Sequence, residues 1–242
     1  MKNNTSQIIV KRIILSLVIL TFGLIDFTVS LENVNAQSTN KNQTTAKKPQ
    51  RVTFKPPNRG KPKKRGVAAS RRGCPAFEKS LTALIPPLDV NLTYSQSPTF
   101  LFHIPALPPE ARVGEFIIQD MQDNDIYRTS INLPEKAGII NVELPASQQS
   151  LTVNQTYQWY FKIYCQPQNK SIYLFVNGNV ERVSPDNYST ENIWFDNLAN
   201  IAEKLRASPQ NPTVKEEWTA FLQDGELAEF ANQPLLPCCN VK

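Results

Sequence analysis

The sequence predicts a mainly β protein with C-terminal α-helices: an antiparallel, immunoglobulin-like β-sandwich followed by two or three helices packed on it. Two patterns indicate this class. Between residues 100 and 183, apolar and polar residues alternate in short runs separated by turn sequences, as in antiparallel strands with one buried face. After Pro185 the apolar residues recur every three or four positions, as on a helix with one apolar face.

The expected strands differ in how clearly they alternate. In the clearest run, 157–165, Trp159 lies on the face that should be buried, whereas Tyr160 and Tyr164 lie on the other face. We expect Trp159 to pack in the core between the sheets. We expect Tyr160 and Tyr164 to form a floor under the helices, with an exposed platform for a stacked ligand as the alternative. The remaining runs are 100–104, 115–119, 127–133, 139–144 and 172–183.

Two helices are expected near the C-terminus. The apolar stripe of the first consists of Trp194, Leu198, Ile201, Ala202 and Leu205. In the second, Thr213 and Glu216 form a capping-box pattern before Trp218, and Gly225 stands where the helix should end. A short third helix can follow it. We therefore place residues 74–242 in one domain with a single core, for which a chain of this length buries about 70% of its surface.

The first 36 residues have the features of a secretory signal peptide. Basic residues precede an apolar run at 13–25, and small residues after it place the expected cleavage before Gln37, with a cut after Ser30 as the second choice. An uncleaved anchor is the alternative, because about 20 apolar residues can cross a membrane, but Asp26 disfavours it. Either way, we expect the domain to be periplasmic or secreted.

Residues 37–73 form a basic segment. They contain twelve Lys or Arg and no Asp or Glu, together with proline and many small polar residues. Such a composition cannot bury enough apolar surface to offset the entropy of ordering. We therefore expect a disordered linker between the signal peptide and the domain.

The charge of the chain is divided between the linker and the domain. Residues 74–242 carry eleven basic and nineteen acidic side chains, so the net charge of +5 does not indicate nucleic-acid binding. We expect the linker to contact an anionic glycan or phospholipid of the cell envelope, with a solvated spacer as the alternative. The candidate contact residues are Lys61, Lys63, Lys64, Arg65, Arg71 and Arg72.

Four cysteines, Cys74, Cys165, Cys238 and Cys239, are candidates for disulfide bonds, because such bonds persist outside the cytoplasmic membrane. Four cysteines allow three pairings. A bridge between the neighbours Cys238 and Cys239 would be strained. We therefore predict that each of them pairs with a distant partner, Cys74 or Cys165. With no CxxC spacing and one histidine, a zinc site is not expected.

The ionisable residues do not form a recognisable catalytic or metal-binding pattern. The single histidine, His103, lies within a strand without a nucleophile motif beside it, so we interpret it as a half-buried structural residue. Asp120, Asp123 and Asp125 crowd one hairpin and could hold calcium, but they lack the spacing of a calcium loop and fit ordinary turn chemistry. We predict no catalytic residue, no metal and no cofactor.

Several short segments of the sequence are similar to those of a known protein family. They are LTALIP at 81–86, LT at 92–93, SPTF at 97–100, EFIIQD at 115–120, YQWYFKIYC at 157–165, VERV at 180–183, IWFDNL at 193–198 and CC at 238–239. Together they resemble a cyanobacterial secreted family known only as domain of unknown function 928. The resemblance covers residues 74–239 and implies export and a cyanobacterial origin. It brings no catalytic residues, and Asn179 stands where the family usually has an aromatic residue.

The function that follows is a non-enzymatic binding or accessory module of the cell envelope. It would bind an envelope polyanion or an envelope protein and no nucleic acid, and it would meet the membrane only peripherally or through an uncleaved anchor. One alternative is an extracytoplasmic sensing module that partners a membrane receptor. Another is a hydrolase with a carboxylate site.

Overall fold

The structure is a computed structural model. It describes residues 51–58, 69–70, 74, 77, 79–146, 150–166, 168–237 and 239. The chain divides into two units, residues 1–46 and 47–242, and every described residue belongs to the second. The predicted signal peptide at 1–36 lies outside the described residues. So do one cysteine and the basic candidates: Cys238, Lys61, Lys63, Lys64, Arg65, Arg71 and Arg72.

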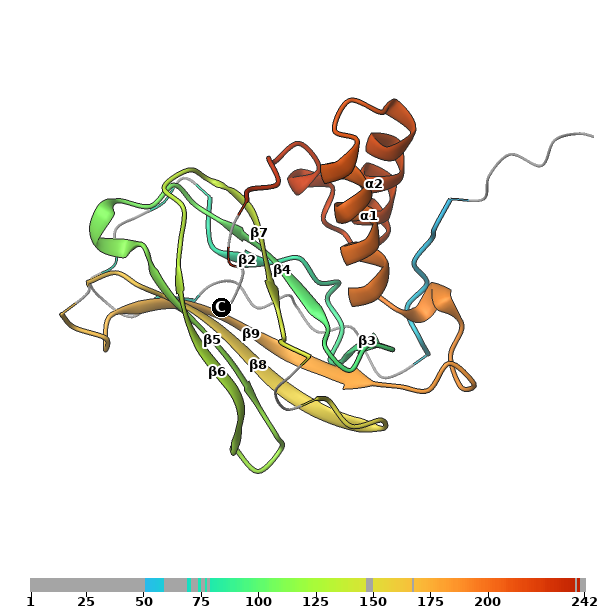
Figure 1. Ribbon diagram of the computed structural model, residues 1–242, viewed down its shortest axis with the longest axis horizontal. Coiled ribbons are helices and arrows are strands. Elements are labelled where there is room, and N and C mark those ends of the chain that lie inside the picture. The colour runs from blue at the N-terminus through green and yellow to red at the C-terminus, as the bar shows by residue number, and fades with distance from the viewer. Residues whose placement is uncertain are drawn as a thin grey trace, which may run out of the picture. The chain divides into compact units, whose positions relative to one another are not determined.

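The larger of two sheets contains the longest strands of the domain (Figure 1). Its order is β1 (Ala69–Ser70), β9 (Tyr173–Arg182), β8 (Gln155–Tyr164), β5 (Val113–Gln119) and β6 (Asp125–Asn132). These neighbours pair antiparallel, whereas β3 (Asn91–Thr93) runs parallel to β9. The parallel pair departs from the purely antiparallel arrangement that the sequence predicted.

The smaller sheet has the order β2 (Thr82–Ala83), β4 (Thr99–Ile104) and β7 (Gly138–Glu143). Its strands are antiparallel, and β4 pairs with β7 along its full length. The described chain is therefore mainly β with two sheets, which is consistent with the predicted sandwich.

Aromatic side chains fill the space between the sheets. Phe102 of the small sheet stacks on Phe161 of the large sheet with ring centroids 4.4 Å apart, and Phe100 lies 4.9 Å from Phe116. Trp159 is fully buried among them, as predicted. A Cβ atom on Gly178 would lie 2.6 Å from the Trp159 ring, so only glycine fits there without displacement of the indole.

Two helices follow the strands, α1 (Phe195–Ala207) and α2 (Pro212–Asp224). Within the described ranges, neither helix has the length and apolar character that crossing a membrane requires. The short 3₁₀ helices of the domain are η1 (Pro109–Ala111), η2 (Thr190–Asn192) and η3 (Ala228–Phe230). The existence of two C-terminal helices confirms the prediction.

The start of α2 differs from the predicted capping box. The N-cap is Asn211, whose side chain accepts a hydrogen bond from the backbone N–H of Thr213 at 3.0 Å, and Pro212 occupies the first helical position. Proline is favoured there because its missing N–H would have no partner in the first turn. The helix ends at Gly225, as predicted.

The helices and the C-terminal segment cover the small sheet. Helix α1 packs against β4 and β3, and its Arg206 donates a hydrogen bond to the Asn141 side chain in β7 at 2.9 Å. The ring of Phe230 lies 5.1 Å from that of His103 in β4. Figure 1 shows both helices on the side of β4, away from β5, β6 and β8. The expectation that Tyr160 and Tyr164 in β8 form their floor is therefore wrong.

Residues 51–58, here called the strap, lie across the helices. They belong to the segment that we expected to be disordered, yet Phe54 is only 5% exposed. Its ring contacts Trp194 edge to face at a centroid distance of 4.9 Å and lies 6.3 Å from Phe221. The expectation of disorder is therefore wrong for the strap, and also for Ala69–Ser70, which pair with β9. The other residues of 37–73 lie outside the described ones.

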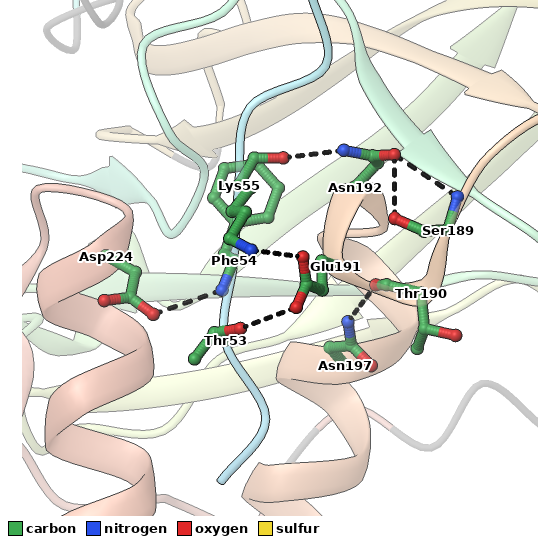
Figure 2. A network of polar contacts seen from close by, with 9 residues as sticks. All are labelled: Thr53, Phe54, Lys55, Ser189, Thr190, Glu191, Asn192, Asn197 and Asp224. Atoms are coloured by element: carbon green, nitrogen blue, oxygen red, sulfur yellow. Dashed lines mark hydrogen bonds and ion pairs between the residues drawn. The ribbon is translucent and has the colours of Figure 1, made fainter. Parts of the chain in front are cut away.

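Polar contacts hold the strap on both sides (Figure 2). The Phe54 backbone N–H donates to the Asp224 carboxylate at 3.1 Å, and Arg51 lies 3.4 Å from the same carboxylate. The Lys55 backbone N–H donates to the Glu191 carbonyl at 2.8 Å, and the Lys55 ammonium lies 2.7 Å from the Glu191 carboxylate. The strap thus joins α2 to η2.

Cys74 and Cys165 form a disulfide bond, with their Cα atoms 5.3 Å apart. Cys165 follows β8 directly, and the bond fastens the chain before β2 to this end of the large sheet. Cys239 is also disulfide-bonded. The predicted bonds from Cys238 and Cys239 to Cys74 and Cys165 are therefore wrong, because those two distant partners bind each other.

Candidate functional site

The outer face of the large sheet is the candidate site, and we call it the aromatic face. Cross-strand pairing places its residues together: Tyr164 pairs with Tyr173, Lys162 with Phe175 and with Glu115, and Ile117 with Tyr160 and with Arg128. Because paired residues point to the same side of a sheet, these side chains form one surface over four strands. The predicted platform residues Tyr160 and Tyr164 both belong to it.

Glu115 lies at the centre of the polar contacts on this face. Its carboxylate accepts a hydrogen bond from the Tyr164 hydroxyl at 2.9 Å and lies 2.8 Å from the Arg128 guanidinium. The Lys162 ammonium lies 3.8 Å away, and Arg128 also contacts Asp125 at 2.7 Å. The Glu115 side chain is 12% exposed, so its charge is largely sheltered and balanced by these cations.

Three aromatic rings continue the face toward β9. The rings of Tyr164 and Tyr173 meet nearly perpendicular, with centroids 6.2 Å apart, and Tyr173 and Phe175 lie 5.8 Å apart. The Lys162 ammonium lies 5.3 Å from the Tyr173 ring, and the Lys170 ammonium 5.5 Å from the Tyr164 ring. The result is an aromatic surface interleaved with cations.

The two predicted platform residues have different roles on this face. Tyr164 is 6% exposed, and burial together with the Glu115 charge raises its pKa to about 12. Tyr160 is half-buried and donates a hydrogen bond to the Gln158 side chain at 2.8 Å. Tyr164 is therefore a buried residue that contacts Glu115 and Tyr173, whereas Tyr160 is partly exposed.

Sequence reasoning missed Tyr173 and Phe175, which are half-buried and carry the accessible aromatic surface beside Tyr160. Both fall within the predicted strand 172–183, two positions apart and hence on one face. The sequence did not reveal which face, because this depends on the register that pairs Tyr173 with Tyr164.

His103 lies far from these aromatic residues in the fold, on the covered side of the small sheet. It is 0% exposed rather than half-buried as predicted, and its Nδ1 lies 3.3 Å from the Ser80 carbonyl oxygen. Burial lowers the pKa of its imidazole, an effect that the Ser80 carbonyl partly opposes. Nothing among its described contacts is a nucleophile.

The aspartates of the β5–β6 hairpin bond within their own turn. Asp120 accepts hydrogen bonds from the backbone N–H groups of Gln122 and Asn124, both at 2.9 Å, and the Asn124 side chain holds its pKa below the usual value. Asp123 has a positive φ of 64°. These are features of turn chemistry. Among the described residues, no group of three or more His, Cys, Asp or Glu is placed to hold a metal ion.

These features define a class of protein: a disulfide-bonded, two-sheet β domain with helices over one sheet and an aromatic, charged face on the other. The chain belongs to the family described as Domain of Unknown Function (DUF928), whose pattern matches residues 65–190 and 186–235. This match confirms the family that the sequence resembles, whereas the export and the cyanobacterial origin that the resemblance implied stay predictions. No curated protein matches the chain.

Proposed function

We propose that this protein is a non-enzymatic binding module that works outside the cytoplasmic membrane and presents its aromatic face to a glycan of the cell envelope. The observation that carries the proposal is the exposure of this face. Helix α1 packs against β4 of the small sheet and α2 packs against α1, whereas Tyr160, Tyr173 and Phe175 are only half-buried on the large sheet. Partly exposed aromatic rings at a flat face suit stacking on the apolar sides of sugar rings.

The charged groups of the face suit the same ligand. Arg128 and Lys162 retain donors beyond those bound to Glu115, and these donors can reach hydroxyl or carboxylate oxygens of a sugar. Glu115 itself is already bound by three partners, so it is a poor candidate for a free general acid or base. This engagement, with the complete burial of His103, supports a binding role over a hydrolytic one.

Export is supported by the N-terminal sequence and by the Cys74–Cys165 disulfide. A basic start and an apolar run precede the domain, as in secretory signals. Disulfides persist in oxidising compartments and are rare in the cytoplasm. A periplasmic or secreted location is therefore part of the proposal.

The basic segment supplies a second contact, with a polyanion. Its charge is uninterrupted by acidic residues, and clustered Lys and Arg attract anionic surfaces at about 1 kcal/mol per residue. The candidate contact residues stay those of the sequence: Lys61, Lys63, Lys64, Arg65, Arg71 and Arg72. Such a contact would hold the domain near an envelope surface while the aromatic face binds its ligand.

The glycan proposal is tested by co-sedimentation of the mature protein with purified peptidoglycan. We expect Phe175→Ala and Tyr173→Ala each to weaken binding about three- to tenfold, which is the range that one aromatic contact provides. Met121→Ala is the matched control, because Met121 is 53% exposed at the β5–β6 hairpin, and it should bind normally. Equal sedimentation of all three variants would contradict the proposal.

The polyanion contact is tested separately, with vesicles that contain anionic phospholipid. Replacement of Lys61, Lys63, Lys64 and Arg65 by Gln should weaken vesicle binding at least about tenfold at physiological salt. The same replacement should leave peptidoglycan binding through the aromatic face unchanged if the two contacts are independent. Vesicle binding that is insensitive to both salt and these substitutions would argue against an electrostatic contact.

A further inference from the structure

A groove lies where the end of α1, the first two turns of α2 and the segment 231–237 meet, away from the aromatic face. Its volume is about 670 Å³, within the range of roughly 300–1,000 Å³ that is typical of small-molecule sites. Leu205 and Pro209 line it from the end of α1, Trp218 and Thr219 from α2, and Ala231 and Leu235 from the C-terminal segment. The groove is thus built by three parts of the chain.

The walls of the groove are mainly apolar. Trp218 is 1% exposed, and its indole N–H already donates to the Ala231 carbonyl at 3.2 Å. With that donor satisfied and the ring almost completely buried, the indole lies beneath the surface of the groove. Leu205 and Leu235 are half-buried beside it, so apolar surface here still contacts water. Removing this surface from water would favour an apolar ligand.

The ionisable residues that line the groove are both cationic. They are Arg206 and Lys215, and no Asp or Glu belongs to its lining. Arg206 donates to the Asn141 side chain at 2.9 Å, and the Lys215 ammonium lies 3.3 Å from the Gln210 side-chain oxygen. An ammonium has three donors and a guanidinium five, so both groups keep donors for an anion.

We propose that this groove binds a single-chain anionic amphiphile, namely one alkyl chain that ends in a carboxylate. The alkyl chain would lie along Leu205 and Leu235, above the buried ring of Trp218, and the carboxylate would be held by Lys215 and Arg206. The charge of the groove selects an anion over a neutral chain, and its apolar walls select a chain over a small inorganic anion. A fatty-acid carboxylate satisfies both conditions.

Sodium dodecanoate is the probe, and its binding to the mature protein is measured by calorimetry below its micelle concentration. We expect one molecule to bind per chain. Affinity should increase about fourfold per CH₂ between octanoate and dodecanoate, the value for burial of an alkyl chain. Dodecanol, which lacks the charge, should bind more weakly than dodecanoate.

Tryptophan fluorescence locates the bound chain. A dodecanoate that carries bromine on its chain should quench Trp218, which lines the groove, and the quenching should disappear in Trp218→Phe. Thr219→Trp, at an exposed position of α2, should fill the groove and block binding without disturbing the core.

Two lysines of the helix pair provide a matched test of the charge. Lys215→Gln should weaken dodecanoate binding about two- to fivefold, as expected for an exposed ion pair. Lys204→Gln removes the same charge from α1 at a position that does not line the groove, where Lys204 pairs with Glu217 at 3.1 Å, and should have no effect.

Three outcomes would overturn the proposal. They are no dodecanoate binding, dodecanol binding as tight as that of dodecanoate, and sedimentation with lipid vesicles without binding of the monomeric amphiphile, which would indicate a bilayer contact instead. Tyr173→Ala, on the aromatic face, should leave dodecanoate binding intact. The result is therefore independent of the proposed glycan function.

Discussion

The two sheets of this domain differ in what lies on their outer faces. The outer face of the small sheet is covered by α1 and the C-terminal segment, and its His103 is 0% exposed. The outer face of the large sheet instead combines ion pairs around Glu115 with the half-buried rings of Tyr173 and Phe175. Both sheets are buried on their inner faces by the same aromatic core.

This difference shows how the residues on the outer face of a strand indicate whether that face is covered. On β4 the second face carries Leu101 and His103, both buried, whereas on β5 and β8 it carries Glu115 and Lys162. Covering a charged side chain costs free energy unless every group finds a partner, so charges accumulate where water remains. Aromatic residues between such charges therefore lie on a surface that stays in contact with water.

The largest effect on stability is expected from a substitution in the strap, which packs on the helices beside the small sheet. Phe54→Ala should lower the free energy of unfolding by about 3 kcal/mol, because it removes a buried ring that packs edge to face against Trp194 and Phe221. Urea unfolding measures the change. A red-shifted tryptophan emission under native conditions would show that the strap has left Trp194.

Phe175→Ala is the control for this prediction on the aromatic face. Its ring is half-buried at the sheet surface, so its loss should cost about 1 kcal/mol. If the two substitutions destabilised the protein equally, the strap would not be a packed part of the domain. Phe54 lies outside the family-matched region 65–235, so the test also shows whether the packed domain extends beyond that region.

The strands were predictable from the sequence because their alternation is local. The run 157–165 corresponds to β8 and the run 139–144 to β7, and the buried Trp159 followed from the same alternation. The two-residue strands β1 and β2 and the parallel β3 were missed, since two or three residues show no periodicity.

The candidate site could be predicted only in part. Period two placed Tyr160 and Tyr164 on the correct face of their strand, but it could not show which sheet the helices cover. That choice depends on long-range contacts such as Arg206 with Asn141. The strap was hidden for a related reason, because a single buried Phe54 in a basic segment has no local pattern.

A smaller effect on stability is expected from a substitution in the ion pairs of the aromatic face. Glu115→Gln should lower the free energy of unfolding by about 1 to 2 kcal/mol, since it removes a sheltered carboxylate and leaves Arg128 and Lys162 close together. The pKa of Tyr164, now about 12, should fall, because a nearby negative charge no longer opposes formation of the phenolate.

Absorbance titration of tyrosine ionisation measures that pKa, with Tyr164→Phe to identify the transition. Burial is the larger cause of the raised value, so the pKa in Glu115→Gln should stay above the ordinary 10.0. A pKa that does not move would mean that Glu115 does not act on Tyr164. Such a result would leave the face aromatic but without the charge balance described above.

The smallest expected effect concerns His103 under the cover of the small sheet. Burial depresses the pKa of its imidazole below 6.5, and the neighbouring Lys79 acts in the same direction, whereas the Ser80 carbonyl, Gln233 and Glu229 oppose it. Between the depressed folded value and 6.5, the unfolded chain binds more protons than the folded one. The free energy of unfolding should therefore fall as the pH drops below about 6.5, and this contribution should level off below the folded pKa.

Urea unfolding of the wild type and of His103→Gln between pH 7.5 and pH 5 isolates this contribution. The difference in stability between the two proteins should narrow as the pH falls, because Gln cannot take up a proton. Tyr164→Phe, on the aromatic face, should follow the wild-type curve over this range, since that phenol titrates only in strong alkali. Parallel curves for the wild type and His103→Gln would mean that His103 keeps its ordinary pKa in the fold. The cover would then admit water to the small sheet, and the contrast between the two outer faces would be weaker than the burial of His103 indicates.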